Sequence, residues 1–550
     1  MGVLLVASAL SCRRHPLGDH ADSGPPVVDT AVVDPGVDAP TDHGAGGDAT
    51  DARAPIDTAD AADVADAPDA RDANDAGDAN DGPSVPPVPC GALRALTAKG
   101  PFTSRHARNL LFSADRRLLV VQAAGPPDDL LLVALPEGVP QMLLAGVKNA
   151  EWLGRSGMVL AEMHSTGDLV VAPLDGTPLR TIARNSCAHL AVPDGSRVFA
   201  VSDCNARPII GKLDEIDVAT NTTTPRASEA ANVLAVSPSG RFAAYVAHDP
   251  ESDGIMHVLD GDRDLTLSPA AADAPAFVSG ERLLFLTPGS HLSNAHLQVP
   301  GTNATSQLVA QDRHFGFRGY RISPDGSRAL AAQWPATRQP PFATDLFAIR
   351  VDGAVGETLL ANDLLPYDLS QLGISPFTFT ADGGRVVFMA SSSTAPMGVF
   401  AVQSIGGDRR QLALGNAFAV SPYADRVAII ETNSSSNKQA IHFVAAATGV
   451  EAFTASSDSA VGGVAFVAGD RGLVYVERAS PNRLHHVSFV DGGNTTIAAW
   501  NRSQIPLGDG PQGEIRTGYP VDPTGCFTIV DSDVPESAGT SLVVLPDAPE

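Results

Sequence analysis

The sequence is poor in lysine, aromatic residues and long apolar runs, and each shortage excludes a class of protein. Only four of the 37 basic residues are lysine, and 63 acidic residues outnumber all basic ones. A formal net charge of −26 repels nucleic-acid phosphates, so we expect no DNA or RNA binding. Hydrophobic residues still reach 43%, which is enough for a large core. The abundance of arginine over lysine, with much alanine, glycine and proline, is typical of high-GC bacterial coding.

The N-terminus carries a short apolar run, Gly2–Leu10, followed by Ser11 and Cys12. The run is far below the roughly twenty residues that cross a bilayer, but it fits the apolar part of a signal peptide. Ala9–Cys12 resembles a bacterial lipobox, although no basic residue precedes the run and Ala9 replaces the usual leucine. The resemblance implies that residues 1–12 are a signal peptide, that Cys12 is lipidated, and that the protein is an exported outer-membrane lipoprotein facing the periplasm or the cell surface. The alternative is a buried strand with an incidental cysteine.

Residues 13–89 form an acidic segment with seventeen aspartates, no glutamate and four arginines. From Asp57 to Asp81 an aspartate recurs at every third residue among alanine, asparagine and glycine. Such a composition cannot bury enough apolar surface to offset chain entropy, so we expect a disordered, extended tether. A calcium loop is the alternative for Asp72–Gly82, but its ligands should alternate and end in glutamate. The three-residue period favours a solvated spacer.

The remainder of the chain repeats one motif, whose clearest copy is Tyr320–Gln333 (YRISPDGSRALAAQ). Proline, aspartate and glycine in SPDG are typical tight-turn residues, and alternating or apolar segments on either side predict two strands. The turns recur roughly 40 to 57 residues apart. The ten copies are Leu111–Val121, Glu151–Ala161, Leu190–Val201, Leu234–Val246, Ala276–Leu286, Tyr320–Gln333, Phe377–Met389, Phe418–Ile430, Val464–Val476 and Tyr519–Val530.

Each repeat continues with a third strand such as Asp345–Val351 and a short fourth strand such as Arg410–Leu414. Four short antiparallel strands per unit, with no helical periodicity, predict an all-β fold, a β-propeller with one large ring of 8–10 blades over residues 90–550. SPDG followed by a basic residue resembles the WD40-like (TolB-like) propeller repeat. The tenth unit lacks a fourth strand, and Ala92–Ala98 is predicted to supply it and close the ring.

Four cysteines follow the lipobox. Cys187 and Cys204 flank the third repeat's turn at nearly equal distances, which predicts a disulfide at the open end of that hairpin, with two free buried thiols as the alternative. Cys90 and Cys526 lie in the two segments proposed to close the ring, and a second bridge there is attractive. This cysteine count suits an oxidising compartment.

No motif in the sequence indicates catalysis. The nearest match to the G-x-S-x-G nucleophile elbow, Gly154–Gly157, lacks the spacing and is a hairpin turn. No metal-ligand spacing is present, so we expect neither a catalytic residue, a metal nor a cofactor. An arginine recurs after most turns and could form an anion-binding circle, but a solvated turn residue near an aspartate is the better interpretation.

Binding is expected on the opposite face, where the longest connections surround the fifth to seventh repeats. Aromatic residues and arginine are typical of interfaces. The predicted binding residues are Phe315, Phe317, Arg318, Trp334, Arg338 and Tyr367. We therefore expect a monomeric, non-catalytic scaffold that binds an envelope protein or surface ligand and touches the membrane only through its lipid anchor. The alternatives are a propeller hydrolase or lyase acting on sugars or peptides, and a structural or adhesive surface protein.

Overall fold

The computed structural model describes Cys90, Ala92 and residues 107–544, except for a set of internal segments. These segments are 114–117, 124, 126, 155–156, 206–209, 248–254, 269–272, 289–292, 301–306, 314–320, 334–343, 355, 365–376, 393–394, 433–437, 458, 468–470, 480, 491, 501–525 (where Cys526 follows) and 533–538. The described residues include no apolar helix with the length needed to cross a membrane. The signal peptide, Cys12 and the acidic segment lie outside the described residues, and their predictions stay predictions.

Antiparallel strands make up nearly all of the regular structure, beginning with two seven-stranded sheets and one four-stranded sheet. The first sheet contains β1 (Ala107–Phe112), β2 (Leu118–Ala123), β3 (Asp128–Ala134), β4 (Pro140–Trp152), β5 (Met158–Met163), β6 (Leu169–Pro173) and β7 (Arg180–Ala183). The second contains β8 (Ala188–Ala191), β9 (Arg197–Ser202), β10 (Gly211–Asp217), β11 (Thr222–Val236), β12 (Phe242–Ala247), β13 (Ile255–Asp260) and β14 (Arg263–Ser268). The third contains β15 (Asp273–Val278), the 3-10 turn η1 (Ser279–Glu281), β16 (Arg282–Pro288), β17 (Ser293–Gln298) and β18 (Gln307–Arg313).

The second half of the unit continues the same pattern. An eight-stranded sheet contains β19 (Arg321–Ile322), β20 (Arg328–Gln333), β21 (Thr344–Arg350), β22 (Glu357–Leu364), β23 (Phe377–Phe379), β24 (Arg385–Ser392), β25 (Ala395–Gln403) and β26 (Arg410–Leu414). Two four-stranded sheets follow, with β27 (Ala417–Val420), β28 (Arg426–Thr432), β29 (Gln439–Ala445), β30 (Glu451–Ser457), then β31 (Ala460–Phe466), β32 (Gly472–Arg478), β33 (Asn482–Ser488) and β34 (Asn494–Trp500). The last pair is β35 (Phe527–Ser532) and β36 (Gly539–Val544).

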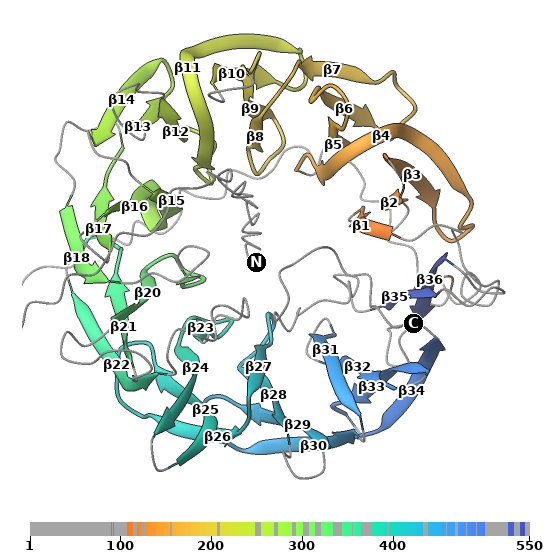
Figure 1. Cartoon of the computed structure of the whole chain (residues 1–550), viewed down its shortest axis with the longest axis vertical. Helices are drawn as coiled ribbons and strands as arrows, with labels where there is room; N and C mark the ends of the chain where they lie inside the picture. Colours follow the sequence, from red (N-terminus) through yellow and green to blue (C-terminus); the bar gives the residue numbers. More distant parts are fainter. Residues whose placement is uncertain are drawn as a thin grey trace, which may run out of the picture. The chain divides into compact units, whose positions relative to one another are not determined.

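These strands form consecutive four-stranded antiparallel meanders, which we call blades and number along the chain. The long strands β4 and β11 each serve two blades, because their first halves end one blade and their second halves begin the next. Blades 1 to 9 thus run from β1 to β34, and β35–β36 belong to a tenth. Within residues 85–550, Figure 1 shows the blades following one another around a centre, with first strands inside and fourth strands outside. This arrangement confirms the predicted all-β propeller.

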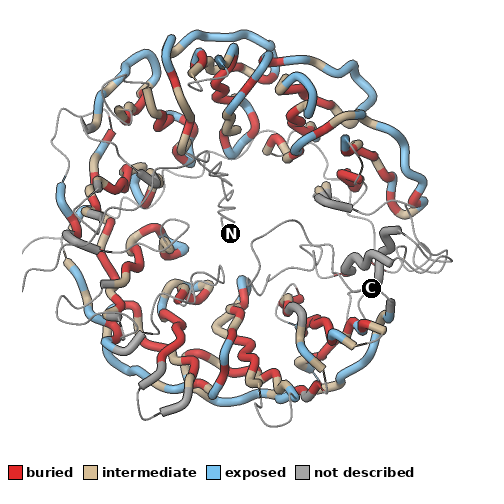
Figure 2. The backbone as a smooth tube through the Cα atoms, in the orientation of Figure 1, coloured by how far each residue is buried: buried red, intermediate tan, exposed pale blue. Residues whose placement is uncertain are grey.

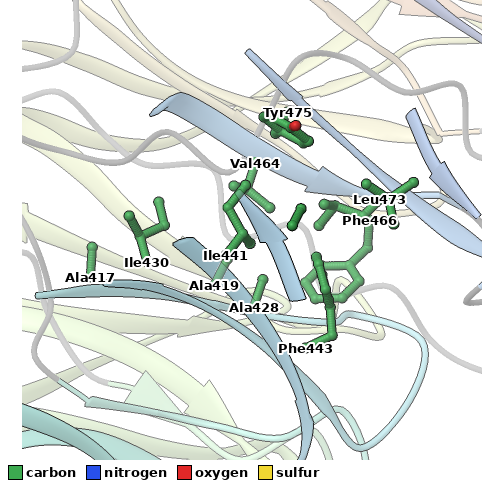
Figure 3. Packing of buried hydrophobic residues seen from close by; sticks show 12 residues of the cluster. Ala417, Ala419, Ala428, Ile430, Ile441, Phe443, Val464, Phe466, Leu473 and Tyr475 are labelled. Carbon is green, nitrogen blue, oxygen red and sulfur yellow. The ribbon is translucent and has the colours of Figure 1, made fainter. Parts of the chain in front are cut away.

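Successive side chains along a strand point to opposite faces of the blade, and both faces pack against the neighbouring blades. Clusters of buried side chains join every consecutive pair of blades from 1 to 9. Figure 3 shows the cluster between blades 8 and 9, where Ile441 and Phe443 of β29 meet Leu473 and Tyr475 of β32. Most of the exposed residues in Figure 2 lie on the outer strands. Burial between sheets, and not within one, therefore holds the unit together.

The repeated turns also pack directly on one another. In the SPDG turn, Asp325 accepts hydrogen bonds from the backbone N–H of Ser327 at 3.0 Å and from the Ser323 hydroxyl at 2.5 Å. Burial alone would raise the pKa of Asp325, but these hydrogen bonds outweigh it and lower the pKa. Gly326 has φ +68°, and its carbonyl accepts the N–H of Ser279 from blade 5 at 3.1 Å. The motif therefore closes a hairpin and contacts the preceding blade.

Other neighbouring turns repeat this close approach. A Cβ on Gly154 of blade 2 would lie 2.2 Å from the Asp194 carbonyl carbon of blade 3. A Cβ on Gly195 would likewise lie 2.4 Å from the carbonyl carbon of Leu153. Only glycine lets the two backbones meet at this distance.

A polar layer lies among the apolar clusters and was not predicted. Four histidines occupy equivalent positions on the third strands of their blades: His257, His296, His442 and His485. They pair across the sheet with residues 245, 285, 429 and 475 of the second strands. In blade 4 His257 contacts Asp264 at 3.0 Å, and in blade 8 His442 lies between Glu431 and Glu451 at 2.9 and 2.6 Å. These hydrogen bonds satisfy partly buried polar groups inside the blades.

Two disulfides are present, joining Cys187 to Cys204 and Cys90 to Cys526. The second connects the N-terminal edge of the folded unit to the residue before β35. The prediction of a strand at Ala92–Ala98 is wrong at its first residue, because Ala92 has a helical backbone. The rest of that segment lies outside the described residues. Its Ala-Leu-Arg composition favours a helix locally, and the covalent bridge needs no strand ladder.

Replacing Gly326 by alanine should destabilise the fold by about 2–4 kcal/mol, because the new Cβ would lie 2.7 Å from the Ser279 nitrogen and the backbone has positive φ. The matched control is Gly261→Ala, where φ is +58° but no atom lies within 4 Å of the new Cβ. That control should cost only about 1–2 kcal/mol. Urea unfolding measures both, and equal losses would contradict a role for the turn contacts between blades.

Candidate functional site

The binding residues predicted from the sequence all lie outside the described residues: Phe315, Phe317, Arg318, Trp334, Arg338 and Tyr367. The structure therefore does not show whether these residues lie together, and their role in binding stays a prediction. A candidate site must be built from the described residues.

Antiparallel topology gives every blade two different ends. The turns between first and second strands and between third and fourth strands lie at one end, which we call the turn face. The connections between second and third strands lie at the other end, the loop face. Three of the turn-face arginines are engaged, because Arg197, Arg241 and Arg385 pair with Glu215, Asp260 and Asp408 at 2.7–2.8 Å. These guanidinium groups are neutralised within their own blades, as the structural interpretation of the arginine circle expects.

A group of titratable side chains lies at the inner edge of blades 2 and 3. It consists of Lys148, Asn149 and Glu151 from β4, Glu162 from β5 and His189 from β8, and we call it the inner-edge cluster. Glu151 and Glu162 alternate with residues that face blade 1, so both carboxylates face blade 3. His189 lies on β8, the first strand of blade 3, and its Nε2 is 3.9 Å from the Glu151 Oε1. Figure 1 shows β8 on the inner side of its blade. Three strands, β4, β5 and β8, thus bring three ionisable groups together.

Glu162 is the satisfied carboxylate of the cluster. Its residue surface is 8% exposed, its Oε1 pairs with the Lys148 ammonium, and its Oε2 accepts the Asn149 amide at 3.1 Å. Gln122 of β2 holds the β4 backbone beside this pair, because its amide donates to the Lys148 carbonyl at 2.9 Å and to Asp128 at 3.1 Å. A buried carboxylate with a cation and an amide donor is fully compensated.

Glu151 is not compensated. Its Oε1 is buried and has no hydrogen-bond partner, and His189 Nε2 lies 3.9 Å from it. Burial raises the pKa of the Glu151 carboxyl. Burial lowers the pKa of the His189 imidazole; the Glu162 charge opposes this and the Lys148 charge adds to it. The environment therefore disfavours the charged forms of both groups, which are close but not bonded.

Trp152, next along β4, has a second uncompensated atom. Its indole Nε1 is buried without an acceptor, and its ring packs with the cluster of blades 1 and 2. Unsatisfied buried polar atoms are uncommon in folded proteins, and each needs an explanation such as strain, an ordered water or a ligand. Among the described residues they also occur at Asn232, Arg385, Arg410 and Asp425. The first strand of blade 2 carries two of them on consecutive residues.

Sequence reasoning assigned Glu151 and Trp152 only to a degenerate turn copy. The signal that could have identified them is an acidic residue and a tryptophan on an innermost strand, where the repeats usually hold small apolar residues such as Ala417 and Val464. The partner His189 could not be paired with them without the packing of blade 2 on blade 3.

Comparisons with known proteins give weak likenesses. No protein-family model matches the chain, and no curated protein sequence matches it. A eukaryotic initiation factor structure is 11% identical, covering 68% of this chain and 94% of its own, with a TM-score of 0.43. TolB from Acinetobacter baumannii is 13% identical, covering 52% and 76%, with a TM-score of 0.25. The β-propeller domain of the Trilobed protease from Pyrococcus furiosus is 12% identical, covering 64% and 97%, with a TM-score of 0.31. These TM-scores lie below 0.5, so the fold assignment rests on the strand topology.

Glu151→Gln should stabilise the fold at neutral pH, because it removes a charge that the folded state disfavours. A raised folded pKa contributes stability below the ordinary value of 4.5 and loses it as the pH rises through the folded pKa. The gain over wild type should therefore be present at pH 7 and disappear toward pH 4. Since 40% of the side chain is exposed, water screens the charge and the gain should be a few tenths of a kcal/mol.

The control for this prediction is Glu162→Gln, which breaks the compensated pair with Lys148 and should lower stability at pH 7. Urea midpoints for the two variants across this pH range supply the measurement. A loss of stability in Glu151→Gln at pH 7 would show that Glu151 is an ordinary structural carboxylate.

Proposed function

We propose that residues 90–550 act as a non-catalytic binding propeller that recognises an envelope protein or another envelope ligand. In this proposal the acidic segment 13–89 is a tether and Cys12 carries a lipid anchor in the outer membrane of a bacterium. Two disulfides support export, because disulfides persist mainly in oxidising compartments. The ligand contacts the loop face and the inner edge, including the predicted loops around Trp334 and Arg338.

The observation that carries the proposal is the uncompensated Glu151 carboxylate. The rest of its cluster, Glu162 with Lys148 and Asn149, is satisfied internally. A fold that compensates one carboxylate and leaves its neighbour without a donor supports a ligand that supplies the missing hydrogen bond. On the turn face Arg197, Arg241 and Arg385 are paired with carboxylates, although Arg385 Nη1, Arg410 Nε and Asp425 Oδ1 are also buried without a hydrogen-bond partner.

A second candidate function is acid–base catalysis at the same cluster. Opposite pKa displacements of a carboxyl and an imidazole are typical of enzymes that divide proton donor and acceptor roles. We favour binding, since His189 and Glu151 approach only to 3.9 Å and neither positions the other through a hydrogen bond.

Cross-linking with a lysine-reactive reagent in envelope extracts tests the binding proposal. Among the described lysines, Lys212 and Lys438 lie where strands meet loop-face connections, and Lys148 lies inside β4 where that strand passes from blade 1 to blade 2. The side chains of Lys148 and Lys212 are 55% and 61% exposed. We expect the full chain to cross-link to a partner through these lysines, and Trp334→Ala with Arg338→Ala to reduce the yield at least about fivefold, as for interface hot spots.

The control is Val490→Lys, which places a reporter amine in an 84% exposed position on the turn face. That amine should not link to the partner. Links at the introduced amine, with none at the native lysines, would place the partner on the turn face and contradict the proposal.

A further inference from the structure

The ligand chemistry of the inner-edge cluster can be inferred from what the cluster already contains. We propose that Glu151 receives a cationic N–H donor, a guanidinium or primary ammonium group such as an arginine or lysine side chain of a peptide partner. This inference rests on the binding function proposed above and specifies its ligand.

The basic residues of the cluster itself do not donate a hydrogen bond to Glu151. Lys148 is held by Glu162, which it contacts closely, and Asn149 donates to the same carboxylate. His189 is the only other basic group that contacts Glu151 among the described residues, and its Nε2 stays 3.9 Å away, beyond hydrogen-bond distance. The cluster thus holds two carboxylates and one engaged ammonium, and one acid remains without a counterion.

The group that completes such a site must donate hydrogen bonds and bring positive charge. A neutral donor would satisfy the oxygen but leave a partly buried charge, whereas a cation also offsets the desolvation of the carboxylate. Oε1 itself has no exposed surface, but 40% of the Glu151 side chain is exposed, so a ligand cation would approach the exposed part of the carboxylate and Oε1 would turn outward to meet it. The chain's net charge of −26 also attracts a cationic ligand over longer distances.

The raised pKa of Glu151 agrees with this assignment. Bound cation stabilises the ionised carboxylate, so binding should weaken as the pH falls through that pKa, and binding near it should release a proton. Calorimetry in buffers of different ionisation enthalpy measures that release.

The test is calorimetric titration of the purified full chain with a short arginine peptide with blocked ends, and with the same peptide carrying neutral citrulline. Spermidine tests whether a small free amine suffices in place of a peptide. We expect the arginine peptide to bind at least about tenfold more tightly than the citrulline peptide, the range that separates charged from neutral hydrogen bonds. Glu151→Gln should abolish this preference.

Glu137→Gln is the matched control, because it removes the same charge from an exposed turn-face residue. It should leave the preference for arginine intact. Equal affinity for both peptides, no binding of the arginine peptide, or a preference that survives in Glu151→Gln would overturn the inference. If the native lysines still cross-link to an envelope partner in that case, the ligand assignment alone fails; if those links are also absent, the proposed function fails with it.

Discussion

The structure depends on the close approach of backbone turns in neighbouring blades. Gly154 and Gly195 meet with no room for a Cβ, and Gly326 accepts a hydrogen bond from the turn of blade 5. Because each blade is only four short strands, it cannot bury both faces alone, and the turns fix the distance at which apolar clusters between blades can form. The SPDG motif therefore joins neighbouring blades as well as reversing the chain.

Much of the fold was predictable because the turn chemistry is local. The fourth strand predicted at Arg410–Leu414 has the same bounds as β26, and the third strand predicted at Asp345–Val351 differs from β21 by one residue at each end. The continuous strands β4 and β11 were not predicted. In both, a register shift inside the strand replaces a turn between blades. In β4 Gly146, with φ +78°, marks that place, whereas residues 227–232 of β11 contain neither glycine nor proline.

The candidate site was less predictable, since it depends on packing between blades. Glu151 and His189 are 38 positions apart in sequence and lie on different blades, so neither periodicity nor motif spacing relates them. Two carboxylates of similar local sequence differ only in their neighbours, with Glu162 held by Lys148 and Glu151 by no donor. The predicted aromatic loops remain a separate hypothesis about the same binding event.

The turn face joins neighbouring blades, and we propose that the inner edge of blades 2 and 3 receives the ligand. Hydrogen exchange of the full chain, with and without its cross-linked envelope partner, tests it most directly. We expect new protection in the second half of β4 and in β8, with the turns around Gly195 and Gly326 unchanged. Protection confined to those turns, with β4 and β8 exchanging as in the free protein, would contradict it.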